Sequence, residues 1–260
     1  MITKLSVASL ILAAIVIGWY ANEAICQDFV TDGLLGFWSL DANTVKGDVL
    51  KDVAGKNDGT IVGSPKSVQG KIKEALEFNG TTDYVKLPDM GNEPEVTVEA
   101  WALAHSLPPA AHSCCIGIVS SAPEDQWKAG TVHFKFEAGL ITAHKNDPDK
   151  KLTFNGVVVD QWYHAAYTSN TTKNEFKLYV DGKLIGKDIT GAVPNNLTHI
   201  RIASEHEGRY LPGIVDEVRI YKRALSEDEI AKNFNAKTNS LAVVDAKDKL
   251  AITWGEIKQF

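Results

Sequence analysis

The sequence predicts an all-β fold, a two-sheet antiparallel jelly-roll sandwich with one short helix near the C-terminus. Short segments of alternating apolar and polar residues recur from Asp32 onward, which is typical of half-buried antiparallel strands. An Asp181-Gly182 pair between two apolar runs predicts a tight hairpin, because both central residues of such a turn adopt positive φ. About ten such segments within roughly 190 residues fit two packed sheets.

The composition is that of an ordinary globular protein. The chain has 260 residues, of which 44% are hydrophobic and 23% charged, so it holds enough apolar mass for one sandwich with short extensions. Its formal net charge is −6. A nucleic-acid partner is excluded on this ground, because neutralising phosphates requires a basic surface.

The N-terminus has the layout of a secretory signal. One positive charge precedes an apolar run over 5–20, and small residues follow at Ala24 and Cys26. We expect a signal peptide over 1–26 and a mature chain that starts at Gln27 and is secreted or held in the cell envelope; cleavage after Ala24 stays open. The alternative is an uncleaved anchor, the one route to a membrane. The run is shorter than the roughly 20 residues needed to cross one, which favours cleavage.

The strands follow one another with turn residues between them. In 132–137 the apolar side chains face one way, while His133, Lys135 and Glu137 face the other. The expected strands are 34–40, 73–78, 83–87, 96–103, 132–137, 162–168, the hairpin 176–186, 199–203 and 213–221. Within them Trp38, Trp101 and Trp162 are expected in the core.

One helix is predicted after the last strand. Ser226 and Glu229 form the pattern of a capping box, in which each side chain accepts a hydrogen bond from the other's backbone. Ile230 and Phe234 lie four residues apart and would dock the helix on the sandwich. The carboxylates here therefore suit a helix start better than catalysis.

The chain divides into the signal peptide, a jelly-roll domain over 27–238 and a C-terminal tail over 239–260. The tail contains two short apolar stretches joined by a charged one. Three interpretations stay open for it: a further strand, a segment docked through Trp254, or a partly disordered end.

Seven segments together resemble the laminin-G-like jelly rolls of bacterial secreted proteins, within the wider concanavalin A-like lectin/glucanase group. The strongest match is Gly-Ile-Val-Asp-Glu-Val-Arg-Ile-Tyr at the last strand. The matching segments are 33–41, 52–60, 76–85, 96–101, 161–164, 176–185 and 213–226. They follow the family's order over roughly 32–236. The segment 108–127 departs from the pattern and is expected to be a longer loop of this chain's own.

The resemblance implies a structural calcium where the first and last strands meet. Its expected ligands are the carboxylates of Asp41 and Asp216, with Asn57 or Gly59 from the first loop and Asp83 as a substitute. Calcium prefers six to eight hard oxygen ligands, which these residues supply. The structural alternative is that Asp216 pairs with a nearby arginine.

The resemblance also admits glycosidases, which place carboxylates along one strand. Retaining hydrolysis needs two carboxyl groups about 5 Å apart. Glu95 and Glu99 share a strand face, but Thr97 stands between them where a third acid is needed. A nucleophile elbow and a phosphate-binding glycine loop are both missing from the sequence. We therefore expect no enzyme, with a glycoside hydrolase or polysaccharide lyase as the least favoured class.

Three cysteines are too few for a disulfide scaffold. Cys114 and Cys115 are adjacent, and a strained ring between them is predicted, with free thiols or metal ligation as alternatives. His105 and His112 lie close by in sequence, so zinc or copper is conceivable. A surface loop without metal is favoured, because two adjacent cysteines rarely chelate one ion without strain.

Ligand binding is expected at loops on the edge of the sandwich. Sugar sites combine an exposed aromatic face with polar groups, and the candidates are Trp127 and the segments 144–147 and 205–210. Of these, Trp127, His206 and Arg209 are the expected ligand-binding residues. For Arg209 the structural alternative is pairing beside the last strand. The predicted function is an exported, non-catalytic module that binds a cell-surface or extracellular glycan; the alternative is a protein–protein adhesion module.

Overall fold

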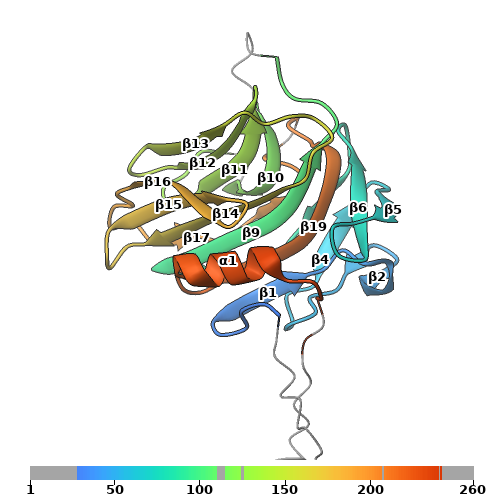
Figure 1. Ribbon diagram of the computed structural model, residues 1–260, viewed down its shortest axis with the longest axis horizontal. Coiled ribbons are helices and arrows are strands. Elements are labelled where there is room, and N and C mark those ends of the chain that lie inside the picture. Colours follow the sequence, from blue (N-terminus) through green and yellow to red (C-terminus); the bar gives the residue numbers. More distant parts are fainter. Residues whose placement is uncertain (1–27, 110–114, 124–125, 207, 240, 242–260) are drawn as a thin grey trace, which may run out of the picture.

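The computed structural model describes residues 28–109, 115–123, 126–206, 208–239 and 241. Within them the chain forms two antiparallel sheets packed face to face, which confirms the predicted jelly-roll sandwich (Figure 1). A third, two-stranded pairing joins β8 (Asn92–Glu93) and β17 (Asn195–Asn196). The signal peptide and nearly all of the predicted tail, with Trp254, lie outside the described residues.

In the described part of the chain one sheet has eight strands. Its order is β16 (Lys183–Asp188), β15 (Glu175–Val180), β14 (Tyr163–Asn170), β9 (Glu95–Ala104), β19 (Pro212–Tyr221), β6 (Glu74–Asn79) and β5 (Lys66–Gln69), with β1 (Leu34–Trp38) paired to β19. The first and last long strands of the domain thus lie side by side, as the resemblance implied (Figure 1).

The second sheet has nine strands among the described residues. Its order is β13 (Lys150–Asn155), β12 (Leu140–Lys145), β11 (Val132–Glu137), β10 (Ile116–Ser121), β18 (Ile200–Ile202), β7 (Tyr84–Lys86), β4 (Gly59–Val62), β3 (Val49–Leu50) and β2 (Val45–Lys46). The 3-10 turn η1 (Ala42–Thr44) precedes β2. This sheet carries the candidate site on its outer face.

The core fills the space between the sheets. Aromatic and aliphatic side chains from alternate strand positions are fully buried there, among them Trp38, Phe134 and Phe176. Trp38 and Trp101 are buried as predicted, while Trp162 is half-buried just before β14.

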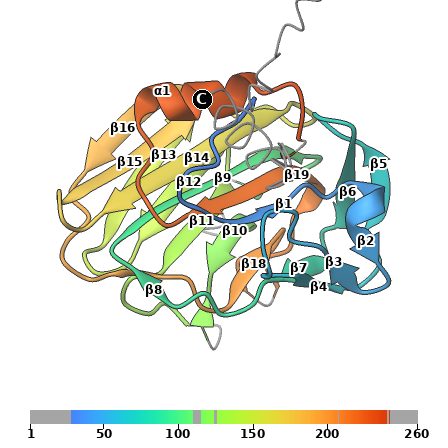
Figure 2. The ribbon, with the colours of Figure 1, turned by 90° about the horizontal axis from the view of Figure 1, so that it is seen from below.

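Helix α1 (Glu227–Asn235) covers the outer face of the eight-stranded sheet (Figures 1 and 2). Both hydrogen bonds of the predicted capping box are present between Ser226 and Glu229. The Phe234 ring stacks on Trp101 of β9 at 5.5 Å, so β9 is buried on both faces. Among the described residues no α-helix covers the outer face of the opposite, nine-stranded sheet.

The predicted hairpin at Asp181-Gly182 is confirmed. Both residues have positive φ, +50° and +74°, and they connect β15 to β16. A Cβ at Gly182 would lie 3.0 Å from the Phe234 ring, so the glycine also allows the helix to approach the turn. The dipeptide is needed for both its backbone conformation and its small size.

The expectation of a long loop over 108–127 is wrong for part of that segment. Residues Ile116–Ser121 form β10, which pairs with β11 and β18 in the middle of the sheet. Gly117 weakened the strand pattern, but the structure requires it: a Cβ there would lie 2.1 Å from the backbone of Ser204. The glycine marks a close approach of two chain segments.

The folded unit continues past residue 238, the predicted end of the domain. Asn239 is buried, and Leu241 packs against the cluster of Phe29 and Phe37. In the described ranges, the single helix falls short of the length and apolar character needed to span a membrane.

Candidate functional site

A cavity of about 270 Å³ opens on the outer face of the nine-stranded sheet. It is lined by Trp127, His133, Lys135, His144, Glu205, His206 and Arg209. His133 and Lys135 project from β11 because the alternate residues of that strand, such as Phe134, enter the core. His144 lies directly across from His133 on β12. Trp127 comes from the β10–β11 loop, and the remaining three residues come from the loop after β18.

Glu205 forms the floor of this cavity and is fully buried. One carboxylate oxygen, Oε1, accepts hydrogen bonds from His133 Nδ1 and from Lys135 Nζ at 3.3 Å. The other, Oε2, accepts from Cys115 Sγ at 2.6 Å and from Arg209 Nη1 at 2.9 Å. Four donors from three segments, namely β11, the residue before β10 and the loop after β18, therefore converge on one buried carboxylate.

These donors decide the protonation state of Glu205. Burial alone would raise the pKa of its carboxyl, but the hydrogen bond from His133, the charge of Lys135 and the hydrogen bond from Cys115 together hold that pKa well below its usual range. Glu205 is therefore an ionised acceptor that orders the groups around it.

Cys115 is held in its thiol form. Burial and the hydrogen bond to Glu205 raise the pKa of the Cys115 thiol to about 12. A ring with Cys114 would remove the proton that this hydrogen bond uses. The predicted ring stays a prediction, because Cys114 lies outside the described residues.

Trp127 forms one wall of the cavity, and 38% of its surface is exposed. Its ring centroid lies 4.1 Å from that of His133, edge to face, and 4.7 Å from that of His144. The Nε2 of His133 is buried and has no hydrogen-bond partner in the described part of the chain. The cavity thus combines an exposed aromatic surface with an unsatisfied polar atom in its wall.

The structure brings together the three residues that the sequence put forward for ligand binding, Trp127, His206 and Arg209. The candidate segments 144–147 and 205–210 also supply His144 and Glu205, whereas sequence reasoning did not select His133 for this site. A signal for His133 was present, since the outward-facing polar side chains of 132–137 were evident from the alternation. The role of Glu205 as the shared acceptor carried no such signal, because its partners His133, Lys135 and Cys115 are distant in sequence.

The predicted calcium ligands separate into two places. Asp41 and Asp216 lie in one buried carboxylate cluster with Glu217. Asn239 Nδ2 donates to Asp41 Oδ2 at 2.7 Å and to Glu217 Oε1 at 2.8 Å. Asn57 instead donates from its amide to the carbonyl of Leu35 at 2.8 Å. None of the hydrogen bonds of the described residues joins Asn57 to either aspartate.

The chemistry of this carboxylate cluster suits a hard cation. Asp216 Oδ2 accepts from the backbone N–H groups of Lys71 and Ile72 at 2.8 and 3.0 Å, while its buried Oδ1 has no hydrogen-bond partner among the described residues. Burial and neighbouring charge raise the pKa of Asp216 to about 8, and burial raises the pKa of Glu217 to about 7. In the part of the chain that the structure describes, however, no three His, Cys, Asp or Glu side chains are spaced to hold a metal ion.

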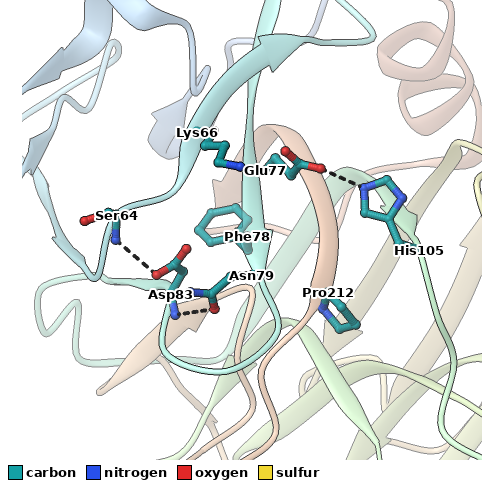
Figure 3. A pocket seen from close by; sticks show the side chains of 8 residues that line it. All are labelled: Ser64, Lys66, Glu77, Phe78, Asn79, Asp83, His105 and Pro212. Atoms are coloured by element: carbon teal, nitrogen blue, oxygen red, sulfur yellow. Dashed lines mark hydrogen bonds and ion pairs between the residues drawn. The ribbon is translucent and has the colours of Figure 1, made fainter.

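A second cavity of about 350 Å³ lies at the edge formed by β5, β6 and the start of β19 (Figure 3). His105 stands between two carboxylates, with Nε2 3.2 Å from Glu77 Oε1 and Nδ1 2.6 Å from Asp160 Oδ1. Asp83, the substitute calcium ligand, accepts instead from the backbone of Ser64. Among its described lining residues Phe78 is the one Phe, Tyr or Trp, and its ring is buried and not available for stacking on a sugar.

The metal site considered for the first loop after β9 is not brought together by the described residues. His105 belongs to the second cavity, while Cys115 lies beneath the first one. His112 and Cys114 fall outside the described residues.

The fold is shared with solved proteins of low sequence identity. Domain 4 of an extracellular GH43 arabinanase from Geobacillus stearothermophilus, in complex with arabinotriose, is 18% identical with a TM-score of 0.61, over 78% of this chain and 98% of that one. Trypanosoma rangeli sialidase in complex with sialic acid is 16% identical with a TM-score of 0.62, over 81% of this chain and 34% of that one. The binding domain of Paraclostridial Mosquitocidal Protein 1 is 17% identical with a TM-score of 0.62, over 80% of this chain and 53% of that one.

These identities show a common fold alone, and function does not follow from it. No curated protein matches the chain. The family model of the concanavalin A-like lectin/glucanases superfamily, of the laminin G type, matches residues 79–231, which is more than half of the 260 residues. The chain belongs to this superfamily.

Proposed function

We propose that this chain is an exported, non-catalytic module that binds carbohydrate in the cavity beside Trp127. The observation that carries the proposal is the exposed indole of Trp127 next to a polar floor built on Glu205. Sugars present an apolar C–H face and a rim of hydroxyls, and such a wall and floor match both. Two of the structurally similar proteins were solved with arabinotriose and sialic acid, which supports the ligand class.

The carboxylate arrangement supports binding over hydrolysis. Glycoside hydrolysis uses two carboxyl groups, one of which needs a raised pKa to act as an acid. Glu205 is the one carboxylate among the described residues that line the cavity, and its pKa is lowered. The four hydrogen bonds that Glu205 accepts favour its ionised form, which has no proton to donate to a glycosidic oxygen.

Calcium enters the proposal as a structural ion at the cluster of Asp41, Asp216 and Glu217. The buried Oδ1 of Asp216, which has no hydrogen-bond partner among the described residues, supports it, with Glu217 replacing Asn57 in the predicted set. Bound there, the ion would neutralise buried negative charge. Melting of the full chain with added calcium and with chelator tests this; the same melting temperature in both would contradict it.

The decisive experiment is a glycan array probed with the full chain and with two variants. We expect saturable hits that Trp127→Ala abolishes or weakens by at least about tenfold, because the stacking surface is lost. Leu184→Ala is the matched control, since it removes an exposed apolar side chain from β16 in the other sheet. Hits that survive Trp127→Ala would place binding elsewhere.

The competing function is a protein-binding module. The similarity to the binding domain of the mosquitocidal protein supports this alternative. The same array separates the two functions: an array without any saturable glycan would contradict carbohydrate recognition and favour a protein partner.

A further inference from the structure

The cavity beside Trp127 presents hydrogen-bond donors. Its carboxylate, Glu205, is fully buried and already accepts from four groups. The side chain of Arg209 is 30% exposed, and Lys135 lines the same cavity. The donors that a ligand meets on the described residues are therefore the guanidinium of Arg209 and the ammonium of Lys135. Burial lowers the pKa of His133, and because its Nδ1 donates to Glu205, the neutral ring presents Nε2 as an acceptor.

Charged side chains continue from the cavity along the same face of the sheet. Lys151 of β13 pairs with Glu137 of β11 at 2.7 Å, and Glu137 lies 3.4 Å from Lys135. Over this face the described residues place three cations, Lys135, Lys151 and Arg209, beside three carboxylates, Glu137, Glu205 and Asp149. Among the described residues that line the cavity itself, however, two cations, Lys135 and Arg209, share the single carboxylate of Glu205.

We propose that the cavity selects an acidic sugar, one that carries a carboxylate or a sulfate. This inference rests on the proposed carbohydrate-binding function and specifies its ligand class. An anionic group offers only acceptors, which complement a donor-rich wall; a neutral sugar offers hydroxyls that need acceptors as well. Arg209 and Lys135 bind the anionic group, and Trp127 contacts the sugar ring.

Glu205 acts as a positioning residue in this arrangement. It holds Arg209 Nη1 at 2.9 Å and Lys135 Nζ at 3.3 Å, so both cations are fixed before the ligand arrives. A preorganised pair loses less side-chain entropy on binding than two mobile side chains. Because Glu205 is buried, its own charge is covered by these donors and does not face the ligand.

The test is titration calorimetry of the full chain with matched probes. One set shares a neutral core: lactose, sialyllactose and sulfated lactose. A second set compares trigalacturonate with its methyl ester, which keeps the sugar and removes the charge. We expect the charged form to bind at least about tenfold more tightly than its neutral partner, and this advantage to shrink between about 0.05 M and about 0.5 M NaCl. The two sets distinguish carboxylate from sulfate as the recognised group.

Variants assign the effect to the cavity. Arg209→Gln and Lys135→Gln are each expected to reduce the advantage of the charged probe about tenfold, and Arg209→Lys to restore part of it. Lys187→Gln on β16, exposed and on the other sheet, is the charge-matched control and should change nothing. If a variant fails to fold, the ester and salt comparisons on the unchanged chain still decide.

Different results would overturn the acidic-sugar inference and the proposed carbohydrate-binding function. Equal affinity for charged and neutral probes, lost in Trp127→Ala, would overturn the acidic-sugar inference and leave carbohydrate binding standing. A full array without any glycan bound would overturn the proposed function itself, and the inference with it.

Discussion

Two buried carboxylate sites of this sandwich differ in how their charge is balanced. Glu205 is surrounded by His133, Lys135, Arg209 and a thiol, and the pKa of its carboxyl is held well below its usual range. Asp216 lies beside Glu217 and Asp41, and its pKa is raised to about 8. A buried carboxylate with cationic partners becomes a fixed anchor for binding groups, whereas one among other carboxylates depends on a proton or a cation.

The largest expected effect comes from removing the buried negative charge of Glu205, which cationic partners balance. Glu205→Gln leaves Lys135 and Arg209 without their buried counter-ion, so the free energy of unfolding should fall by about 3 kcal/mol and glycan binding should be lost. Chemical denaturation measures the free energy of unfolding, and titration calorimetry measures glycan binding. Glu137→Gln, on the same face but more exposed, is the control and should cost less than about 1 kcal/mol. Equal costs for the two variants would refute the central role of Glu205.

The second effect is a pH dependence that originates in the other site. The folded pKa values of Asp216 and Glu217, about 8 and about 7, lie above the ordinary 3.8 and 4.5, so the native state holds protons that the unfolded chain releases. Stability is then full below the ordinary values and is lost as pH rises through 7 and 8. In chelator we expect a loss on the order of 3 kcal/mol between about pH 5 and about pH 8.5.

Thermal or denaturant unfolding at a series of pH values measures this loss. Asp216→Asn should flatten the profile, because the amide does not ionise. Added calcium should also flatten it if the ion binds the ionised carboxylates. A stability that rises from pH 5 to pH 8.5 in chelator would contradict the assignment.

The fold was predictable because its signals are local. The hairpin needs only Asp181-Gly182 between two apolar runs, and the helix start needs only Ser226 and Glu229. Both devices act within a few residues, so strand order does not affect them. The same holds for the outward polar face of β11, which alternation alone assigned.

The site was predictable only in part, because its floor is assembled over long sequence distances. Glu205 is 70 residues from Lys135 and 90 from Cys115 along the chain. The loop after β18 lies over β11 because β10 pairs with both strands. The strand β10 was not predicted, because Gly117 interrupts its apolar pattern. The prediction that Asn57 joins Asp41 in a calcium site failed for the opposite reason. Asn57 is near the first strand in sequence, but its amide donates to the carbonyl of Leu35 and does not reach Asp41.

The smallest expected effect concerns Asn239, which joins the carboxylate cluster from beyond the predicted end of the domain. Its amide donates to both Asp41 and Glu217, and its Oδ1 accepts from Lys73 Nζ at 2.5 Å. Asn239→Ala removes this bridge and should lower the free energy of unfolding by about 1–2 kcal/mol at neutral pH. The loss should be larger at pH 8 than at pH 5, because ionised carboxylates need the donor more than protonated ones do. Asn235→Ala, at an exposed position on α1, is the control. A loss that is the same at both pH values would show that Asn239 fills space and does not partner charge.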